Sequence, residues 1–138
     1  MELYLSFVDL PELRLLAVKV ETFPEGAPAA FQRVESALPS LRGRKLYGVV
    51  YNTSEGLQYY AGVAAADEDE SERLGLPVLT VPAGPYARAN LMHWEEHRDD
   101  IGPTVDHMIE SVDYDPSRPV LEFSRSSFEL QLLVPVGG

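Results

Sequence analysis

The sequence predicts an α+β fold in which a βαββ unit occurs twice and forms one curved antiparallel sheet with two helices on one face. Residues 13–66 show the pattern of a strand, a helix and a two-strand hairpin, and residues 76–136 show the same order again. In both units a proline near the predicted helix start follows the first strand. The opposite face of such a sheet is expected to be partly uncovered, which predicts a ligand groove between the repeats.

The length and composition fit one domain. A chain of 138 residues with 45% hydrophobic residues can bury a core of its own. We therefore expect a single domain over residues 1–138, with repeat one at about 3–66 and repeat two at about 76–136.

Alternating apolar residues and turn residues delimit the elements of the first unit. The predicted elements are, in order, a strand at 13–20 after a break at Pro11, a turn at 23–26, a helix from Pro28 to Pro39, and a hairpin of strands 46–51 and 57–64 around the turn 52–56.

The second unit follows the same order. Its predicted elements are a long strand at 76–91 with a bend at 82–85, a helix beginning at Gly102-Pro103, and a closing hairpin of strands 120–124 and 129–136 around the turn Arg125-Ser126-Ser127. Between the two units, the run Asp67–Glu72 is so acidic that we expect a solvated loop. Residues 88–101 form an insert that carries Trp94, and it could fold over the groove as a lid or a wall.

The charge excludes several classes of partner. Eleven basic against 22 acidic residues give a net charge of −11, which repels phosphate backbones and anionic membrane surfaces, so we expect neither direct nucleic-acid nor membrane binding. The chain has no cysteine, and His93 and His97 match the helical zinc motif poorly because Trp94 stands where its glutamate would be. We expect no metal and no cofactor. The first residues lack the pattern of a secretion signal, which predicts a cytoplasmic protein.

Glu122 lies among apolar neighbours in the strand 120–124. Burying a carboxylate is costly unless something compensates its charge. Three explanations are open: a cationic ligand, an internal partner such as Arg118 or Arg125, or exposure at a sheet edge.

Three stretches resemble the gyrase-inhibitor-like (GyrI-like) family, whose domain is also the effector-binding domain of bacterial multidrug-responsive transcription activators. They are 46–51 with 59–63, then 80–87, then 119–123 with 129–136. The resemblance implies a pocket between the repeats for bulky aromatic or cationic compounds, with Glu122 at its base. Tyr47, Tyr51, Tyr59, Tyr60 and Tyr86 are then candidate walls, as is Trp94, although each tyrosine could equally be structural.

The resemblance leaves three functions open. Without a DNA-binding helix-turn-helix segment, we expect a stand-alone small-molecule-binding protein. Some GyrI-like proteins are hydrolases of reactive, cyclopropane-bearing aromatic compounds, for which Glu122 would be the general acid or base. The family's name also implies a protein partner such as DNA gyrase or a separate regulator, for which the acidic run 67–72 could imitate DNA.

Overall fold

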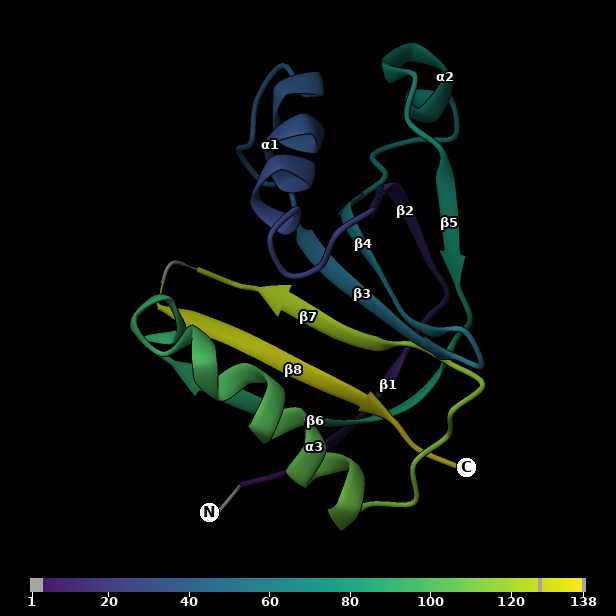
Figure 1. Cartoon of the computed structure of the whole chain (residues 1–138). Helices are drawn as coiled ribbons and strands as arrows, with labels where there is room; N and C mark the ends of the chain where they lie inside the picture. Colours follow the sequence, from purple (N-terminus) through teal and green to yellow (C-terminus); the bar gives the residue numbers. More distant parts are fainter. Residues whose placement is uncertain (1–3, 127, 138) are drawn as a thin grey trace.

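A computed structural model describes residues 4–126 and 128–137, so that Ser127 of the predicted closing turn, and residues 1–3 and 138 of the predicted domain, lie outside the described residues. Eight strands form one curled antiparallel sheet in the order β1-β6-β8-β7-β3-β4-β2-β5 (Figure 1). The strands are β1 (Ser6–Leu10), β2 (Leu13–Val20), β3 (Leu46–Thr53), β4 (Gly56–Ala64), β5 (Val78–Val81), β6 (Gly84–Met92), β7 (Val120–Ser124) and β8 (Glu129–Pro135). The helices are α1 (Ala27–Ala37), α2 (Glu70–Leu74) and α3 (Ile101–Ser111), with the 3₁₀ turns η1 (Trp94–Glu96) and η2 (Arg98–Asp100) before α3.

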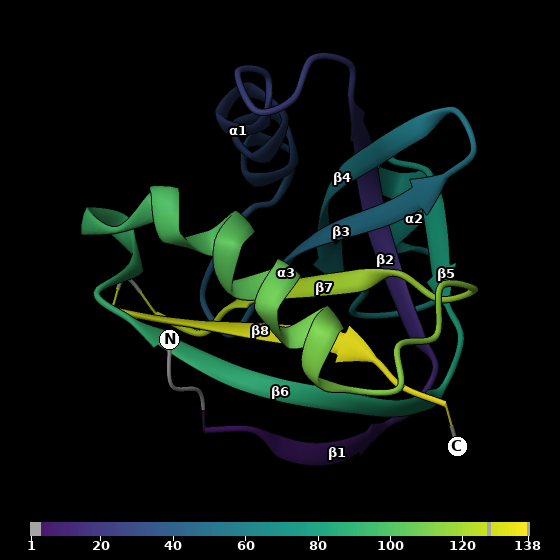
Figure 2. The same ribbon diagram turned by 60° about the horizontal axis from the view of Figure 1, so that its bottom comes forward.

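The predicted duplication is confirmed. The first unit is β2-α1-β3-β4 and the second is β6-α3-β7-β8, and they meet where β3 pairs with β7 in the middle of the sheet. α1 packs against β2 and β4, and α3 packs against β8. Both helices therefore cover the same face of the sheet, one over each unit (Figure 2).

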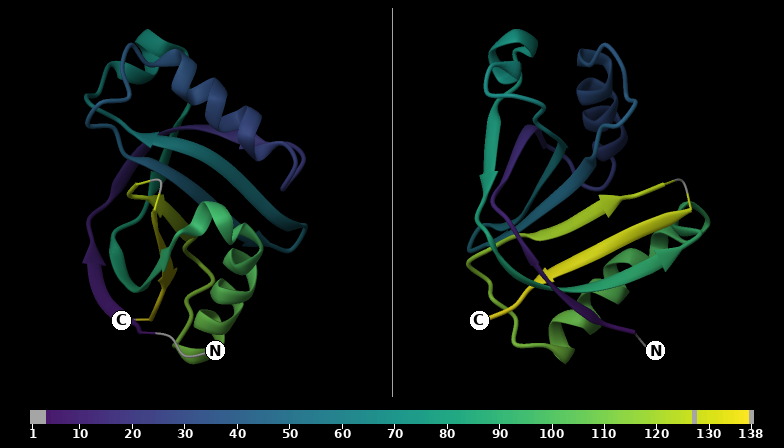
Figure 3. Two further views of the ribbon diagram at one scale, coloured as in Figure 1. Left: turned by 90° about the vertical axis from the view of Figure 1, so that its left-hand side faces the viewer. Right: turned by 180° about the vertical axis from the view of Figure 1, so that it is seen from behind.

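The strands β1 and β5 connect the two units. Ser6 pairs with Arg88 and Leu16 pairs with Val78, so β1–β2 runs beside β5–β6 in one continuous register (Figure 3, right). Pro11 and Pro82 lie at the breaks in the two long strands, where the missing proline N–H costs no ladder bond. β1, which precedes the first unit in the chain, is thus the outer strand of the second unit. β5, which precedes the second unit, is the outer strand of the first.

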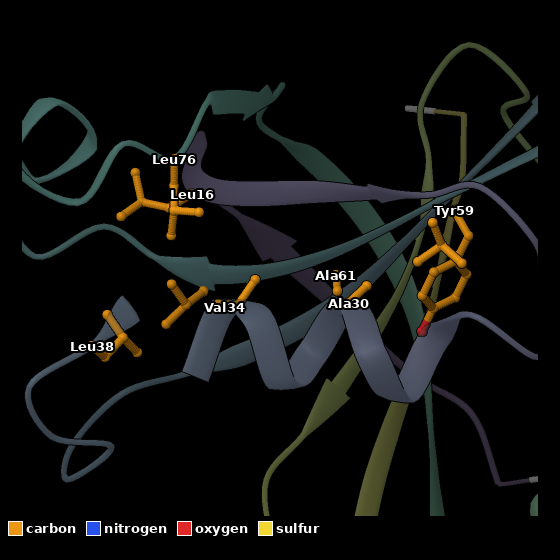
Figure 4. Packing of buried hydrophobic residues seen from close by; sticks show 9 residues of the cluster. Leu16, Ala30, Val34, Leu38, Tyr59, Ala61 and Leu76 are labelled. Atoms are coloured by element: carbon orange, nitrogen blue, oxygen red, sulfur yellow. The ribbon is translucent and has the colours of Figure 1, made fainter. Parts of the chain in front are cut away.

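The sheet has a buried core on each face. On the helix face, α1 packs over Leu16, Ala61 and other small or branched residues (Figure 4), and α3 packs over a second cluster around Met108. On the opposite face, side chains at the alternating strand positions, such as Leu15 and Leu121, are fully buried. This second face is partly uncovered, as predicted: its central residues are buried where the sheet curls, while residues around them such as Tyr51, Tyr60 and Phe123 are partly exposed.

The acidic run is only partly the solvated loop that its charge predicts. Asp67 is exposed, but Glu70 begins α2 and is buried. Arg44 donates two hydrogen bonds to the Glu70 carboxylate, at 2.8 and 2.6 Å, and the N–H of Ala66 donates a third at 3.0 Å. The prediction was wrong for Glu70 because a bidentate arginine compensates its charge, and Arg44 is 26 residues away along the chain.

None of the helices in the described ranges combines the length and the apolar character that crossing a membrane requires.

Candidate functional site

The candidate site is built around a hydrogen bond between Glu122 of β7 and Tyr59 of β4. The Tyr59 hydroxyl donates to Oε1 of Glu122 at 2.6 Å. Both side chains lie on the helix face, since Val120 packs in the α3 cluster and Tyr59 in the α1 cluster. The pair therefore lies over the central strands, between the part of the sheet that α1 covers and the part that α3 covers.

Gly48 of β3 makes this hydrogen bond sterically possible. β3 lies between β4 and β7, and Gly48 is paired directly with Glu122. A Cβ atom at position 48 would lie 2.7 Å from Oε1 of Glu122 and would also overlap the Tyr59 hydroxyl. Gly48 was not among the site residues predicted from the sequence. Its signal was present, because a glycine inside a strand often marks a close approach of another group.

The carboxyl group of Glu122 has no cationic partner among the described residues. Arg118 instead pairs with Asp115 at 3.2 Å, and Arg125 pairs with Glu129 at 3.6 Å. β7 is also an interior strand of the sheet, which excludes exposure at an edge. Neither of the two arginines nor an exposed edge therefore accounts for Glu122, and its internal partner is the Tyr59 hydroxyl.

The surroundings make the charged form of this carboxyl unfavourable. Burial raises the pKa of Glu122, and the hydrogen bond from Tyr59 lowers it by a smaller amount. Burial also raises the pKa of Tyr59, and the neighbouring Glu122 raises it further, so Tyr59 stays the donor. The site therefore holds a half-buried acid that a nearby positive charge would help to ionise.

Two phenylalanines surround the ring of Tyr59. Phe23, in the loop before α1, stacks on it with ring centroids 4.6 Å apart and an interplanar angle of 17°. Phe31 of α1 meets it edge-on at 6.5 Å. Figure 4 shows Tyr59 beside α1, with its hydroxyl directed away from β2. Residues 23–26 were predicted only as a turn, and Phe31 lies in the helix predicted from Pro28 to Pro39, so neither phenylalanine was expected beside the site.

The other predicted tyrosines lie away from Glu122. Tyr47, Tyr51, Tyr60 and Tyr86 pack in the cluster on the opposite face of the sheet. Their ring contacts are with one another or with residues outside the site: Tyr47 with Phe123 at 5.0 Å, Tyr51 with Tyr60 at 6.1 Å, and Tyr86 with the Arg118 guanidinium at 4.9 Å. Alternation along the strands explains the separation, since residues 47 and 51 have the opposite parity to residue 48.

Trp94 lies in η1, which precedes the N-terminus of α3. Its Nε1–H donates to the carbonyl of Ser126 at 3.0 Å, and the guanidinium of Arg98 lies 5.1 Å from its ring centroid. Residues 88–92 of the predicted insert belong to β6, residues 93–100 contain the two 3₁₀ turns, and Ile101 begins α3. The structure thus places Trp94 against the β7–β8 turn and not beside Tyr59.

The histidines do not form a metal site with neighbouring acids. Within residues 4–126 and 128–137, no three His, Asp or Glu side chains come together as metal ligands. His97 lies 3.9 Å from Asp100, and the His93 ring packs edge-on against Phe128.

No family model matches the chain, and no curated protein matches it. Solved structures do. An integron cassette protein from Vibrio cholerae has a TM-score of 0.71 at 11% identity, covering 96% of this chain and 95% of that one. The EcmrR C-terminal domain has a TM-score of 0.67 at 12% identity, covering 99% of each chain. SAV2435, solved with bound tetraphenylphosphonium, has a TM-score of 0.64 at 17% identity, covering 100% of this chain and 95% of that one. At these identities the likeness shows the fold alone, an α+β fold with one curled antiparallel sheet, which is consistent with the GyrI-like fold that the resemblance implies.

Proposed function

We propose that this chain binds bulky lipophilic cations over the central strands β3 and β7, with Glu122 at the base of the site. Tyr59 holds the carboxylate in place, and aromatic rings beside it offer cation–π contacts of about 0.5–2 kcal/mol each. The occupant is a delocalised organic cation, because such a cation gives up its hydration more readily than an ammonium ion does.

The observation that carries this proposal is that the carboxyl group of Glu122 has no cationic partner among the described residues. Its side chain is half-buried, it accepts one hydrogen bond from Tyr59, and no described cation neutralises it. A carboxylate in such surroundings is costly for the free protein and attractive for a cation. The bound tetraphenylphosphonium of SAV2435, a structural neighbour, supports this choice of ligand class.

The test compares two ligands of the same shape and opposite charge. Calorimetric titration with tetraphenylphosphonium and with tetraphenylborate should give saturable binding of the cation and little of the anion. Two unit charges about 6 Å apart attract by about 3 kcal/mol at an effective dielectric constant of about 20, so Glu122→Gln should weaken cation binding by up to about a hundredfold.

Glu55→Gln is the matched control, because Glu55 is an exposed turn residue. Equal affinity for the two ligands, or an unchanged affinity in Glu122→Gln, would contradict the proposal.

A second function is favoured by the pKa of Glu122. Burial raises the pKa of the Glu122 carboxyl group, which suits it to proton transfer, and the hydrogen bond from Tyr59 fixes its orientation. We therefore also propose hydrolysis of strained-ring aromatic compounds, with Glu122 as general acid or base. Turnover of a cyclopropane-bearing aromatic substrate that disappears in Glu122→Gln would support this reaction. If the compound binds saturably and chromatography detects no product, only the binding function is supported.

A further inference from the structure

Phe23 occupies one ring face of Tyr59, the residue that donates a hydrogen bond to Glu122. The two rings are nearly parallel and their centroids are 4.6 Å apart, which is direct stacking contact. No third ring fits between them. A ligand that stacks on this face of Tyr59 must therefore first remove Phe23.

The loop that carries Phe23 is lightly attached to the rest of the fold. Residues 21–25 are all exposed, and the Phe23 side chain is itself 49% exposed despite the stack. The backbone hydrogen bonds of this loop run from Gly26 to Thr22 and from Ala27 to Pro24, and so close the loop on itself. The Phe23–Tyr59 stack is thus a contact between a surface loop and a buried ring, since Tyr59 is only 5% exposed.

We propose that Phe23 is a displaceable cover of the Tyr59–Glu122 pair. In the free protein its ring shields Tyr59, and an incoming aromatic cation takes its place while residues 21–26 move outward. This inference rests on the proposed binding function. It adds that the Phe23 ring competes with the ligand for the ring face of Tyr59. Phe23 then lowers affinity for every ligand, and a ligand with an aromatic face recovers the stacking contact that is lost.

The test is the affinity of Phe23→Ala for tetraphenylphosphonium, measured by calorimetry beside the wild type. Removing the competing ring should tighten binding by about 2- to 13-fold, the factor that corresponds to one aromatic stacking contact. Phe7→Ala is the matched control, because Phe7 is 66% exposed on β1, and its affinity should equal that of the wild type. Glu122→Gln should weaken binding by the same factor in the Phe23→Ala background as in the wild type. This result would mean that the tighter binding of Phe23→Ala occurs at the Glu122 site.

The outcomes separate this inference from the proposed function. If the wild type binds and Phe23→Ala binds equally well or more weakly, the proposal that Phe23 is a cover is overturned, but the binding function is not. Weaker binding in Phe23→Ala would identify Phe23 as a wall of the site. Absence of binding in every variant overturns the binding function and the cover together. Unfolding of Phe23→Ala is monitored by circular dichroism, and Phe23→Leu, which keeps an apolar side chain without a ring, should show the same tightening.

Discussion

Tyr59 and Glu122 belong to strands that are not neighbours, and their side chains meet only above the backbone of Gly48. Any Cβ atom at this position has to displace a buried phenol or a half-buried carboxyl group. Displacing either group leaves a polar atom without its hydrogen bond, which costs about 1–3 kcal/mol.

Gly48→Ala should therefore destabilise the protein by roughly 1–3 kcal/mol and weaken ligand binding. Chemical denaturation measures the first effect and calorimetric titration the second. Gly102→Ala is the control. Gly102 lies in α3, and a Cβ atom added there would meet open space, so alanine should be neutral or should stabilise by up to about 1 kcal/mol. Equal stabilities of the two variants would contradict the steric role of Gly48.

Glu122 should also make stability depend on pH. Because its pKa is raised in the folded state, the native protein holds the proton more tightly than the unfolded chain does. This contribution to stability is fully present below the unfolded pKa, about 4.3, and is lost as pH rises through the folded pKa. Glu122→Gln keeps the acceptor for Tyr59 but cannot ionise.

The stability of Glu122→Gln relative to the wild type should therefore increase from pH 4 to pH 8, by about 1.4 kcal/mol for each unit by which the pKa is raised. Urea unfolding at several pH values measures it. Glu55→Gln, at an exposed turn, should stay within about 0.5 kcal/mol of the wild type throughout. A pH-independent difference for Glu122→Gln would show that its carboxyl is not desolvated.

At the scale of single residues, the sequence singled out Glu122 and Tyr59 of the candidate site but not Gly48 or Phe23 beside them. Glu122 stood out because a carboxylate among apolar strand residues has a recognisable cost. Whether a tyrosine lies on the same face of the sheet as Glu122 depends on the register between their strands. The local sequence of one strand does not determine that register. Phe23 was not identified because its contact with Tyr59 joins a loop to a distant strand.

At the scale of elements, the connection between the units contains a structural ion pair. Arg44 and Glu70 have side chains that are only 15% and 5% exposed, and Arg44 also donates to the carbonyl of Ala64. Arg44 lies just before β3 and Glu70 begins α2, so the pair attaches a short helix to the sheet.

Arg44→Met should cost roughly 2–3 kcal/mol, because it leaves the buried Glu70 carboxylate without a cation. The pKa of Glu70 is lowered, chiefly by its hydrogen bond from Arg44, so the loss should shrink as pH falls and Glu70 is protonated. Thermal unfolding at pH 7 and pH 4 measures this. Arg73→Met is the control: its pair with Asp67 is exposed on both sides, and its contact with Glu70 is longer, at 4.0 Å, so it should lower stability less than Arg44→Met does.

Periodicity and proline positions predicted the two long helices closely. The helix expected from Pro28 is observed at Ala27–Ala37, and the one expected from Gly102-Pro103 at Ile101–Ser111. α2 was missed because five residues with three acidic or basic side chains show no apolar periodicity. Its stability comes from Arg44, a tertiary contact that composition does not reveal.

At the scale of the whole molecule, the exchanged strands β1 and β5 join the two units into one sheet. We expect the protein to unfold in a single transition, since neither unit can lose its sheet without exposing the edge of the other. The repeat predicted one antiparallel sheet of two units but no order of strands. The exchange was not predicted, because residues 6–10 were not recognised as a strand and residues 76–91 were assigned wholly to the second unit.

A core substitution in either unit should lower the stability of both. Leu16→Ala in β2 and Leu132→Ala in β8 remove fully buried side chains and should each cost about 2–5 kcal/mol. Calorimetry should show one peak in both variants, with equal calorimetric and van't Hoff enthalpies. A second peak in either variant would mean that the units unfold separately.

The register between β3 and β7 has a consequence for the asymmetry of the site. Gly48 and Glu122 form the central pair of that register, so they occupy equivalent places in the two repeats. A homodimer of half-length chains would carry the same residue at both places. Two glutamates would repel each other and two glycines would supply no charge. Fusing the halves into one polypeptide lets one copy keep the acid while the other gives it room.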